Sequence, residues 1–469
     1  MRRRHQEEVL SLLSAVLGGE ASKMYDPQVI RTGEKILLPE DTPIPEVIEA
    51  LRRQHTREEQ QTDIHVTLPV PPWDGSVALQ EAIKKNLGVV IQSDNGGAAQ
   101  IEVEVGLNKT IRVPWGTFEL PGMQGAQATM ETDFQEGRLV FKVIVTCKRR
   151  YEDRIRRLLE TTRELAVKNS LHRGKAFSIA FKDDRGRAIA LPSPKFFDLT
   201  ACEPIFNKKL TAAIERNVLV PIRHARELME MGEGVKQGIL FAGNYGVGKT
   251  LLATHIAREA VKYGWTFMYV KNSDELPDAL RFCRHYEPVI VFAEDGDRVA
   301  GTDRTDSVNR LMNELDGVDG KSARVMTILT TNHPERINQG MLRPGRIGLV
   351  LEVEAPNEET VSRMIMAFAG GTLEEGTDCQ PAATKLAGQI PARVQEAVSR
   401  AKREVLRRTG NPRAKITGDD LNVVAQEVID EGNLFKKATT NNGHALATAA
   451  ELLEGSAKAL RTGALNGRT

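Results

Sequence analysis

The chain has 469 residues, which is too long for one ordinary hydrophobic core, so we expect roughly two or three domains. Apolar residues make up 41% and charged residues 27%, the balance of a soluble globular protein. The net charge of +1 gives no overall attraction to nucleic acid or to an anionic membrane. Nucleic acid is therefore not an expected partner. No apolar run approaches the roughly 18 residues that span a bilayer, so a membrane is not an expected partner either.

The first two-fifths of the chain mixes helical and strand patterns. Residues 1–60 are charged and predict a helical segment, in which Pro43 and Pro45 open a helix that runs to Arg53. The pattern changes at Asp63, and an α+β domain is expected over residues 61–195. Alternating apolar residues predict strands at 64–68, 101–105 and 139–145, and helical spacing predicts helices at 79–85 and 151–169.

From about Phe196 the predicted elements alternate between strands and helices, which is typical of a parallel sheet flanked by helices. This α/β domain is expected over 196–356, with strands at 238–242, 266–270, 289–293 and 325–330 and a helix at 250–262. A small helical domain follows over 357–432, where Asn357, Pro391 and Thr417 each favour a helix start. Residues 433–469 are rich in Ala, Thr, Gly and Asn and predict a disordered or weakly helical tail.

A glycine-rich loop lies between the predicted strand 238–242 and the predicted helix 250–262. It reads Gly243-Asn244-Tyr245-Gly246-Val247-Gly248-Lys249-Thr250, and Leu251 follows it. In such a loop backbone N–H groups surround phosphates, the lysine neutralises them, and the hydroxyl ligates Mg²⁺. The bare pattern arises by chance in roughly one chain of fifty this long, but the strand before it and the helix after it favour an ATP-binding loop.

A second apolar strand, 289–293, ends in the carboxylates Glu294, Asp295 and Asp297. Strands often end in acidic turns, so this feature alone is weak evidence. It follows the glycine-rich loop by roughly 45 residues, which is where such a fold holds Mg²⁺ and polarises the attacking water. The segments 311–317, 328–334 and 341–346 then add Asp316-Gly317, a strand ending at Asn332, and the arginines Arg343 and Arg346.

Together these segments resemble AAA-type AAA+ ATPases, of a bacterial-like kind with its own N-terminal domain, over residues 196–429. The resemblance implies a P-loop AAA+ core with a helical lid that binds ATP and Mg²⁺, with Thr250 and Glu294 on the metal side. It implies that Asn332 is sensor 1, that Arg343 and Arg346 are arginine fingers acting on a neighbouring subunit, and that Asp316-Gly317 belongs to an intersubunit signalling segment. A homo-oligomeric ring, usually a hexamer, acting on a protein partner in the cytoplasm is therefore expected; the four widely spaced cysteines fit that reducing compartment.

The chain departs from the family where the family's strand ends Asp-Glu-x-Asp. Here the residues are Glu294-Asp295-Gly296-Asp297, which allows two alignments. In one, Glu294 takes the metal-side place and Asp295 the catalytic place; in the other, Asp295 is the metal-side residue and Gly296 replaces the catalytic carboxylate. We prefer the first, because Pro288 and Asp297 then align without a gap, and it predicts slow but real ATP hydrolysis.

Two further departures concern substrate handling and the lid. The segment 271–277, where the family carries a pore loop, looks short and holds no aromatic residue, so threading by an aromatic paddle is not expected. Phe267 and Tyr269 are interpreted as core residues of the strand before it. Arg393 is open to two interpretations, a sensor 2 arginine or an exposed arginine in a first helical turn, and we favour the second.

The region before the ATPase core carries no motif that names a partner. Trp73 and Trp115 are either partner-binding aromatics or, as we prefer, core residues. The basic cluster between Lys148 and Arg157 contains interleaved acidic residues, and a solvated helix face is favoured over a nucleic-acid site. The leading hypothesis is a ring-forming ATPase that remodels or regulates a protein; the alternatives are an ATP-dependent switch or scaffold with little hydrolysis, and a nucleic-acid-linked ATPase.

Overall fold

The computed structural model describes residues 30–32, 35–37, 44–91, 99–135, 138–183, 185–189, 192, 194–200, 203–300, 306–317 and 323–433. The expectations for most of residues 1–43 and for the tail after residue 433 lie outside these ranges. The chain forms two compact units. The first comprises Met1–Asp198, Ala260–Ala293 and Arg310–Met326, and the second Leu199–Glu259, Glu294–Asn309 and Thr327–Thr469.

The described part of the N-terminal segment is not wholly helical. The strands β1 (Ile30–Thr32) and β2 (Lys35–Leu37) pair in antiparallel fashion where helix was expected. The helix α2 (Ile44–Glu59) follows, and it extends the helix predicted up to Arg53. A charge-rich composition is compatible with either structure, so it could not show the short hairpin.

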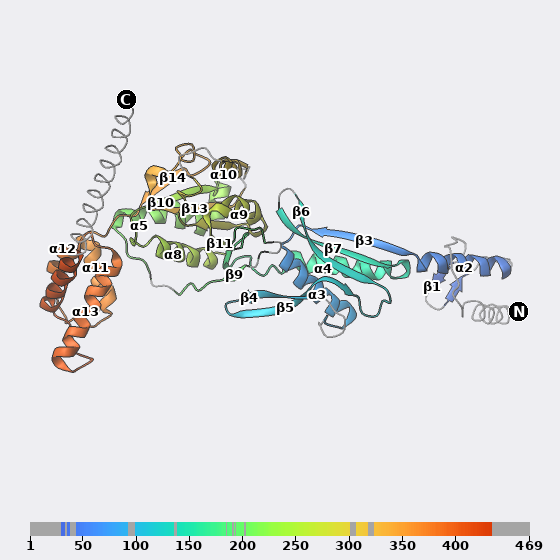
Figure 1. The fold of residues 1–469 in the computed structure, drawn as a ribbon, viewed down its shortest axis with the longest axis horizontal. Helices are drawn as coiled ribbons and strands as arrows, with labels where there is room; N and C mark the ends of the chain where they lie inside the picture. The colour runs from blue at the N-terminus through green and yellow to red at the C-terminus, as the bar shows by residue number, and fades with distance from the viewer. Residues whose placement is uncertain are drawn as a thin grey trace, which may run out of the picture. The chain divides into compact units, whose positions relative to one another are not determined.

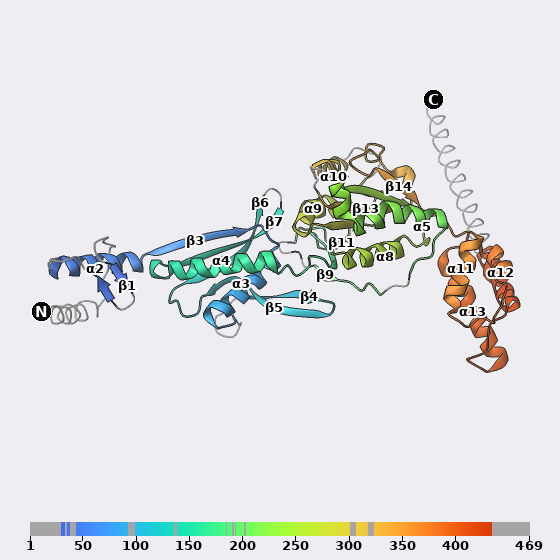
Figure 2. The ribbon, with the colours of Figure 1, turned by 180° about the vertical axis from the view of Figure 1, so that it is seen from behind.

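A five-stranded antiparallel sheet forms the core of the next region (Figure 1). Its strands, in spatial order, are β3 (Gln61–Leu68), β7 (Arg138–Lys148), β6 (Gln127–Gln135), β5 (Lys109–Glu119) and β4 (Ala99–Gly106). The helices α3 (Pro72–Leu87) and α4 (Glu152–Lys168) lie side by side along this sheet, as Figure 2 also shows. The prediction for this region missed β5 and β6.

The helix α3 begins earlier than predicted, at Pro72 rather than Leu79. Proline is well placed there, because its fixed φ suits the first helical turn and its missing N–H is not needed. A β-carbon on Gly75 would lie 2.2 Å from Cγ of Phe141, so a glycine lets the helix approach the sheet closely. Trp73 is 2% exposed, which confirms the interpretation of this tryptophan as a core residue.

A seven-stranded sheet carries the ATPase region, and its order is β14-β10-β13-β12-β11-β8-β9. The pairs β10–β14, β11–β12 and β8–β11 are parallel, and the pair β8–β9 is antiparallel. The strands are β8 (Ala176–Ile179), β9 (Lys195–Phe196), β10 (Gln237–Ala242), β11 (Thr266–Val270), β12 (Val289–Ala293), β13 (Val325–Thr331) and β14 (Leu349–Glu352). This sheet with flanking helices confirms the α/β P-loop fold class, although β8 lies ahead of the boundary expected near residue 196.

One group of helices belongs to the ATPase region with this sheet, and a second group forms the lid. Those of the ATPase region are α5 (Lys208–Ile214), α6 (Val220–Arg223), α7 (Ala225–Glu230), α8 (Lys249–Lys262), α9 (Leu276–Phe282) and α10 (Asp306–Gly317). The lid contains α11 (Glu358–Ala369), α12 (Gln380–Leu386), α13 (Pro391–Thr409) and the helical residues 418–433 (Figure 1). The side chain of Asn357 accepts a hydrogen bond from the Thr360 N–H at 3.0 Å, which confirms the predicted N-cap.

Within the described ranges, no helix has the length and apolar character that crossing a bilayer requires.

Candidate nucleotide-binding site

The glycine-rich loop joins β10 to α8, as its sequence context predicts. Gly246 and Gly248 have φ values of +78° and +99°, which side-chain-bearing residues rarely adopt. Gly243 is needed for a different reason, because a β-carbon there would lie 2.4 Å from the backbone oxygen of Val353. The loop therefore delivers its backbone N–H groups to the N-terminus of α8, where the helix dipole favours an anion.

Lys249 is held inside the loop by three oxygen atoms. Its Nζ donates to the carbonyls of Gly243 and Asn244 at 2.8 and 2.9 Å, and to Oδ1 of Asn332 at 2.7 Å. Burial lowers the pKa of Lys249, and the nearby carboxylates of Asp295 and Glu294 oppose that shift. The structure thus brings together the loop lysine and the polar residue that directly follows β13.

The two carboxylates after β12 face different partners. The Thr250 hydroxyl donates to Oε1 of Glu294. Oδ1 of Asp295 lies 3.5 Å from Nδ2 of Asn332, at the long limit of a hydrogen bond, and Oδ2 lies 3.6 Å from Nη2 of Arg298. Glu294 is therefore on the side of the loop threonine, and Asp295 is on the side of Asn332.

The backbone of this turn is tied to β13. The N–H of Gly296 donates to the Thr330 carbonyl at 2.7 Å, and Asp295 has a φ of +49°. Aspartate is one of the few side-chain-bearing residues that tolerate this left-handed region. Because Gly296 is turned onto β13, this geometry supports the alignment in which Asp295, and not Gly296, occupies the catalytic place.

Sequence reasoning missed several residues at this edge of the sheet. Asp297 served only as an alignment landmark, yet its Oδ1 accepts from the Thr331 hydroxyl at 2.7 Å and so fixes the end of β13. His333 was not singled out either; its Nε2 lies 3.5 Å from the hydroxyl of Tyr245, a residue of the predicted loop that is 69% exposed. Nδ1 of His333 lies 3.3 Å from Glu335. The position of His333 directly after Asn332 was the only available signal.

The predicted arginines lie on the turn between β13 and β14. Arg343 is exposed, whereas Arg346 is half-buried and its Nη1 donates to the Gly340 carbonyl at 2.8 Å. The turn is closed by the Ile347 N–H, which donates to the Met341 carbonyl at 3.0 Å. The structure therefore presents Arg343 outward from a braced turn.

The lid approaches the loop through an apolar residue and not through Arg393. A β-carbon on Gly246 would lie 3.1 Å from Cδ1 of Ile390, so this side chain packs on the loop. Nη1 of Arg393 lies 3.5 Å from both the Gln389 side chain and the Val428 carbonyl. A β-carbon on Gly432 would collide with the same guanidinium at 2.0 Å. These contacts are within the lid, which agrees with the preference against a sensor, but Arg393 is half-buried and not exposed as we expected.

The loop between β10 and α8, the carboxylates after β12 and the polar end of β13 define a P-loop nucleotide-binding domain. Hard oxygen ligands are what Mg²⁺ prefers, and the Thr250 hydroxyl and Glu294 carboxylate supply them side by side. The residues present thus fit a nucleotide with its metal ion.

Comparisons with known proteins assign the family. The family model of the ATPase family associated with various cellular activities (AAA) matches residues 239–355. The 26S proteasome regulatory subunit S10B homolog B of Arabidopsis thaliana is 27% identical over 191 residues, covering 37% of this chain and 48% of that protein. The ATP-dependent zinc metalloprotease FtsH of Thermus thermophilus is 26% identical over 275 residues, 54% of this chain and 42% of that protein. The ATPase family protein 2 homolog of Caenorhabditis elegans is 32% identical over 170 residues, 33% of this chain and 23% of that protein.

Residues 239–355 are an AAA ATPase domain, so the chain is an AAA+ ATPase over this region. It spans less than half of the length of each of these curated relatives.

Proposed function

We propose that this protein binds ATP with Mg²⁺, hydrolyses it slowly, and works as a homo-oligomeric ring, a hexamer, that remodels or regulates a protein partner. The observation that carries the proposal is the meeting of three predicted site residues. Lys249 is bonded to Asn332 at 2.7 Å, and Asn332 in turn lies 3.5 Å from Asp295. A lysine for the phosphates, an amide for orientation and a carboxylate for the attacking water are thereby at one place.

Each residue has a separate task in this proposal. Lys249 exchanges its carbonyl partners for the β- and γ-phosphate oxygens, and the N-terminus of α8 adds positive potential. Asn332 orients the water, and Asp295 accepts its proton. Thr250 and Glu294 would hold Mg²⁺, which when bound would offset the negative charge of the phosphates.

The expected slow rate follows from the length of Asp295. Aspartate is one methylene shorter than the glutamate that the family places here, so the water must move inward to meet it. Misplacement of reacting groups by about 1 Å can lower a rate about a hundredfold. The long contact of 3.5 Å between Asp295 and Asn332 agrees with this view.

A ring is supported by the position of the arginine turn. Arg343 is exposed on a turn that is braced by its own backbone bonds, as a side chain that acts on a neighbouring subunit must be. A guanidinium supplied by another subunit stabilises charge on the transferring phosphoryl group. The relatives include a proteasome regulatory subunit and an ATP-dependent protease, and their names favour a protein as the partner.

Threading by an aromatic paddle is not part of this proposal. The segment between β11 and α9 forms a short 3₁₀ turn, Ser273–Glu275, and contains no aromatic residue. Glu275 is 2% exposed, and its Oε2 accepts from the Phe181 N–H at 2.6 Å. A segment anchored in this way is poorly suited to moving along an extended polypeptide.

Phosphate release by the purified full-length protein tests the proposal. Asp295→Asn should abolish turnover while leaving ATP binding intact, because the backbone of the loop and Lys249 hold the phosphates, and asparagine keeps the size of aspartate but cannot accept the proton of the water. Asp274→Asn, which removes an exposed carboxylate outside the site, is the matched control and should turn over like the wild type. Turnover unchanged in Asp295→Asn would refute the assignment of the catalytic carboxylate.

One observation favours a second function, an ATP-dependent switch or scaffold with little hydrolysis. The distance of 3.5 Å between Asp295 and Asn332 leaves the catalytic pair only loosely engaged. Under this alternative, wild-type turnover would match that of Asp295→Asn, while ATP would still promote assembly in analytical ultracentrifugation.

A further inference from the structure

We propose that the groove between β3 and α4 binds an extended acidic segment of a partner protein, which adds a strand to the edge of the five-stranded sheet. This inference rests on the proposed function, because it names the chemistry of the partner. It concerns a surface of the first unit, far in sequence from the loop that binds nucleotide, so the two can be tested separately.

The groove has an apolar floor. It has a volume of about 420 Å³, and its floor is formed by Ile64 and Val66 of β3 together with Leu159 of α4. Ile64 and Val66 are two residues apart and therefore point to the same face of the strand. Val66 is only partly buried although it packs against the domain core, so α4 does not fully cover the edge strand. We call this feature the β3–α4 groove.

The wall of the groove is positively charged. The side chains on α4 that line it are Arg156, Arg157, Glu160 and Arg163, which gives three positive charges against one negative charge, or a net charge of +2. Arg156 and Arg163 are 62% and 53% exposed and form ion pairs only along the helix, with Glu152 and Glu160. Such exposed ion pairs contribute little to stability, so both arginines can turn to another carboxylate. No ion pair of Arg157 is recorded among the described residues.

Backbone hydrogen bonds along the edge of the sheet would orient the peptide. β3 is an edge strand, and it pairs with β7 along all of its eight residues. In the part of the chain that the structure describes, no strand pairs with its other side. A strand edge of this kind presents unpaired N–H and C=O groups at every second residue, which an extended peptide can pair with.

The dimensions of the wall match an extended peptide. Arg163 lies seven positions after Arg156, or about 10 Å along the axis of α4 at 1.5 Å per residue. An extended strand covers the same distance in about three residues. A peptide whose inward-facing side chains alternate between carboxylates and aliphatic groups would therefore meet the arginines and the apolar floor together.

The charges favour an acidic peptide over nucleic acid. Glu160 lies within the groove, and Glu152, Asp153 and Glu164 lie along the same helix, where they would repel a continuous row of phosphates. No aromatic side chain is among the described residues that line the groove, so bases would have no stacking surface. A peptide can place its carboxylates only where the arginines are.

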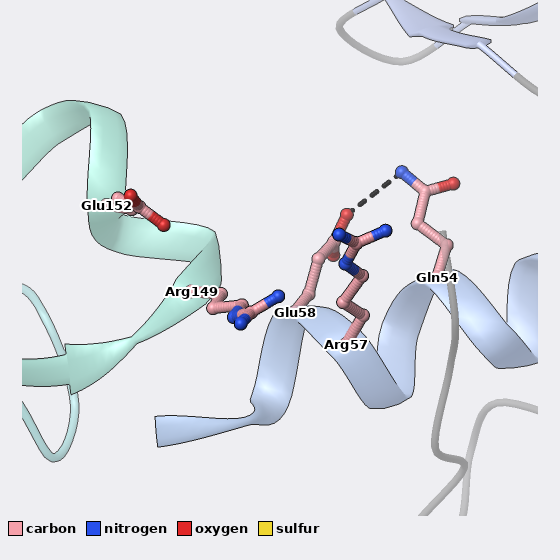
Figure 3. Close-up of a pocket in the computed structure, with 5 residues that line it drawn as sticks. All are labelled: Gln54, Arg57, Glu58, Arg149 and Glu152. Atoms are coloured by element: carbon pink, nitrogen blue, oxygen red, sulfur yellow. Dashed lines mark hydrogen bonds between the residues drawn. The ribbon is translucent and has the colours of Figure 1, made fainter. Parts of the chain in front are cut away.

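A second cavity lacks the apolar floor and the net positive charge of the β3–α4 groove. This second cavity, of about 340 Å³, lies where the end of α2 meets the start of α4 (Figure 3). Arg57 and Arg149 extend into it, but Glu58 and Glu152 balance them, and Gln54 donates to Glu58 at 3.0 Å. Its described lining is wholly polar and has no net charge, so it does not select an acidic aliphatic segment.

Fluorescence anisotropy with the full-length protein, without nucleotide, tests the inference. The probe is a labelled peptide of about eight residues, the length of β3. Every second residue is threonine, and the residues between the threonines are glutamate and valine in turn. The comparison probes are the same peptide with glutamine for glutamate, and a single-stranded DNA of similar length. We expect the acidic peptide to bind at least about tenfold more tightly than either of them.

Variants locate the binding to the groove. Arg157→Glu combined with Arg163→Glu should weaken peptide binding at least about tenfold, since each reversal replaces an attraction by a repulsion. Arg154→Glu, an exposed arginine of the same helix that is not among the residues lining the groove, is the control and should change affinity by less than about threefold. Val66→Lys adds positive charge but fills the floor, so it should weaken binding if the peptide docks there.

Three results would overturn the inference: tighter binding of DNA than of the acidic peptide, equal binding by wild type and the double reversal, or stronger binding by Val66→Lys. The last would show attraction by charge without docking. Both reversed arginines are exposed, so these variants should fold, and a normal rate of phosphate release confirms it. A wild-type protein that hydrolyses ATP but does not bind the acidic peptide would refute this inference alone. A wild-type protein that binds the peptide but does not hydrolyse ATP would refute the proposed function alone.

Discussion

Replacing Gly238 by alanine should separate the arginine turn from the rest of the nucleotide site. Gly238 lies near the start of β10, and a β-carbon there would lie 2.0 Å from the backbone oxygen of Arg346 and 2.9 Å from Cα of Ile347. Ordinary contact begins near 3.4 Å, so the turn must move by about 1.4 Å. The colliding atoms belong to the backbone, and no side chain can rotate away to relieve the contact.

The expected effects follow from this displacement. Forcing a methyl group into a packed site destabilises a fold by about 1–3 kcal/mol, and the gain of about 0.4–1 kcal/mol from a stiffer unfolded chain offsets only part of it. A shift above 1 Å in a group that acts on the reacting phosphate lowers turnover about a hundredfold. Nucleotide affinity should change by less than about threefold, because Lys249 is held by Gly243, Asn244 and Asn332 and not by the turn.

Three measurements check this prediction: phosphate release at saturating ATP, equilibrium binding of a fluorescent ADP analogue, and thermal unfolding. Gly106→Ala is the control, since the nearest atoms to its β-carbon would be 3.9 Å away. Wild-type turnover by a Gly238→Ala protein that is folded would show that the position of the turn does not matter, and the roles proposed for Arg343 and Arg346 would then be wrong.

Two further predictions concern the first unit. Burial raises the pKa of Asp74 to about 6, above its unfolded value of about 3.9, so the stability that depends on its proton is present below about pH 4 and is lost as the pH rises through 6. Between pH 4 and pH 7 the unfolding free energy of the wild type, measured in urea, should therefore fall by about 2 kcal/mol relative to that of Asp74→Asn. Unfolding free energies that change with pH in the same way in both proteins would contradict this. Tyr286→Phe removes the acceptor of the Trp73 Nε1–H, 3.1 Å away, and leaves that buried donor unpaired. We expect a loss of about 1–3 kcal/mol in unfolding free energy, whereas an unchanged denaturation midpoint would mean that the donor finds another partner.

The ATPase region was predictable because its signals are local. The buried parallel strand β12 is a continuous apolar run, β13 is buried along its whole length, and glycine spacing marks the loop before α8. The strand β14 was missed, because its four residues Leu349–Glu352 are too short for a pattern. The strands β5 and β6 were missed for another reason: many of their residues are polar and half-exposed, and their pairing partners lie elsewhere in the chain.

The site was predictable in its residue types but not in its contacts. Spacing alone could name Lys249 and Asn332, but only the fold shows that their side chains are 2.7 Å apart. The approach of Ile390 to Gly246 was hidden, because an apolar residue at the start of a lid helix gives no signal of a role at the loop. Likewise, the role of Asp297 in holding Thr331 depends on two strands that are adjacent only in space.

The order of the two carboxylates agrees with the local backbone. The hydrogen bond from the Gly296 N–H to the Thr330 carbonyl turns the chain back onto β13, and the residue before it takes a φ of +49°. Left-handed backbone costs an ordinary residue about 1–2 kcal/mol, and aspartate tolerates it better than glutamate because its short side chain can bond locally. Glu294 precedes the turn at the end of the strand, where a longer side chain meets no such restriction and reaches Thr250. The short acid therefore occupies the left-handed position and the long acid the position that must reach across to the loop. The inverted pair is thus a consistent local solution, and it supports the view that Asp295 is the carboxylate that faces Asn332.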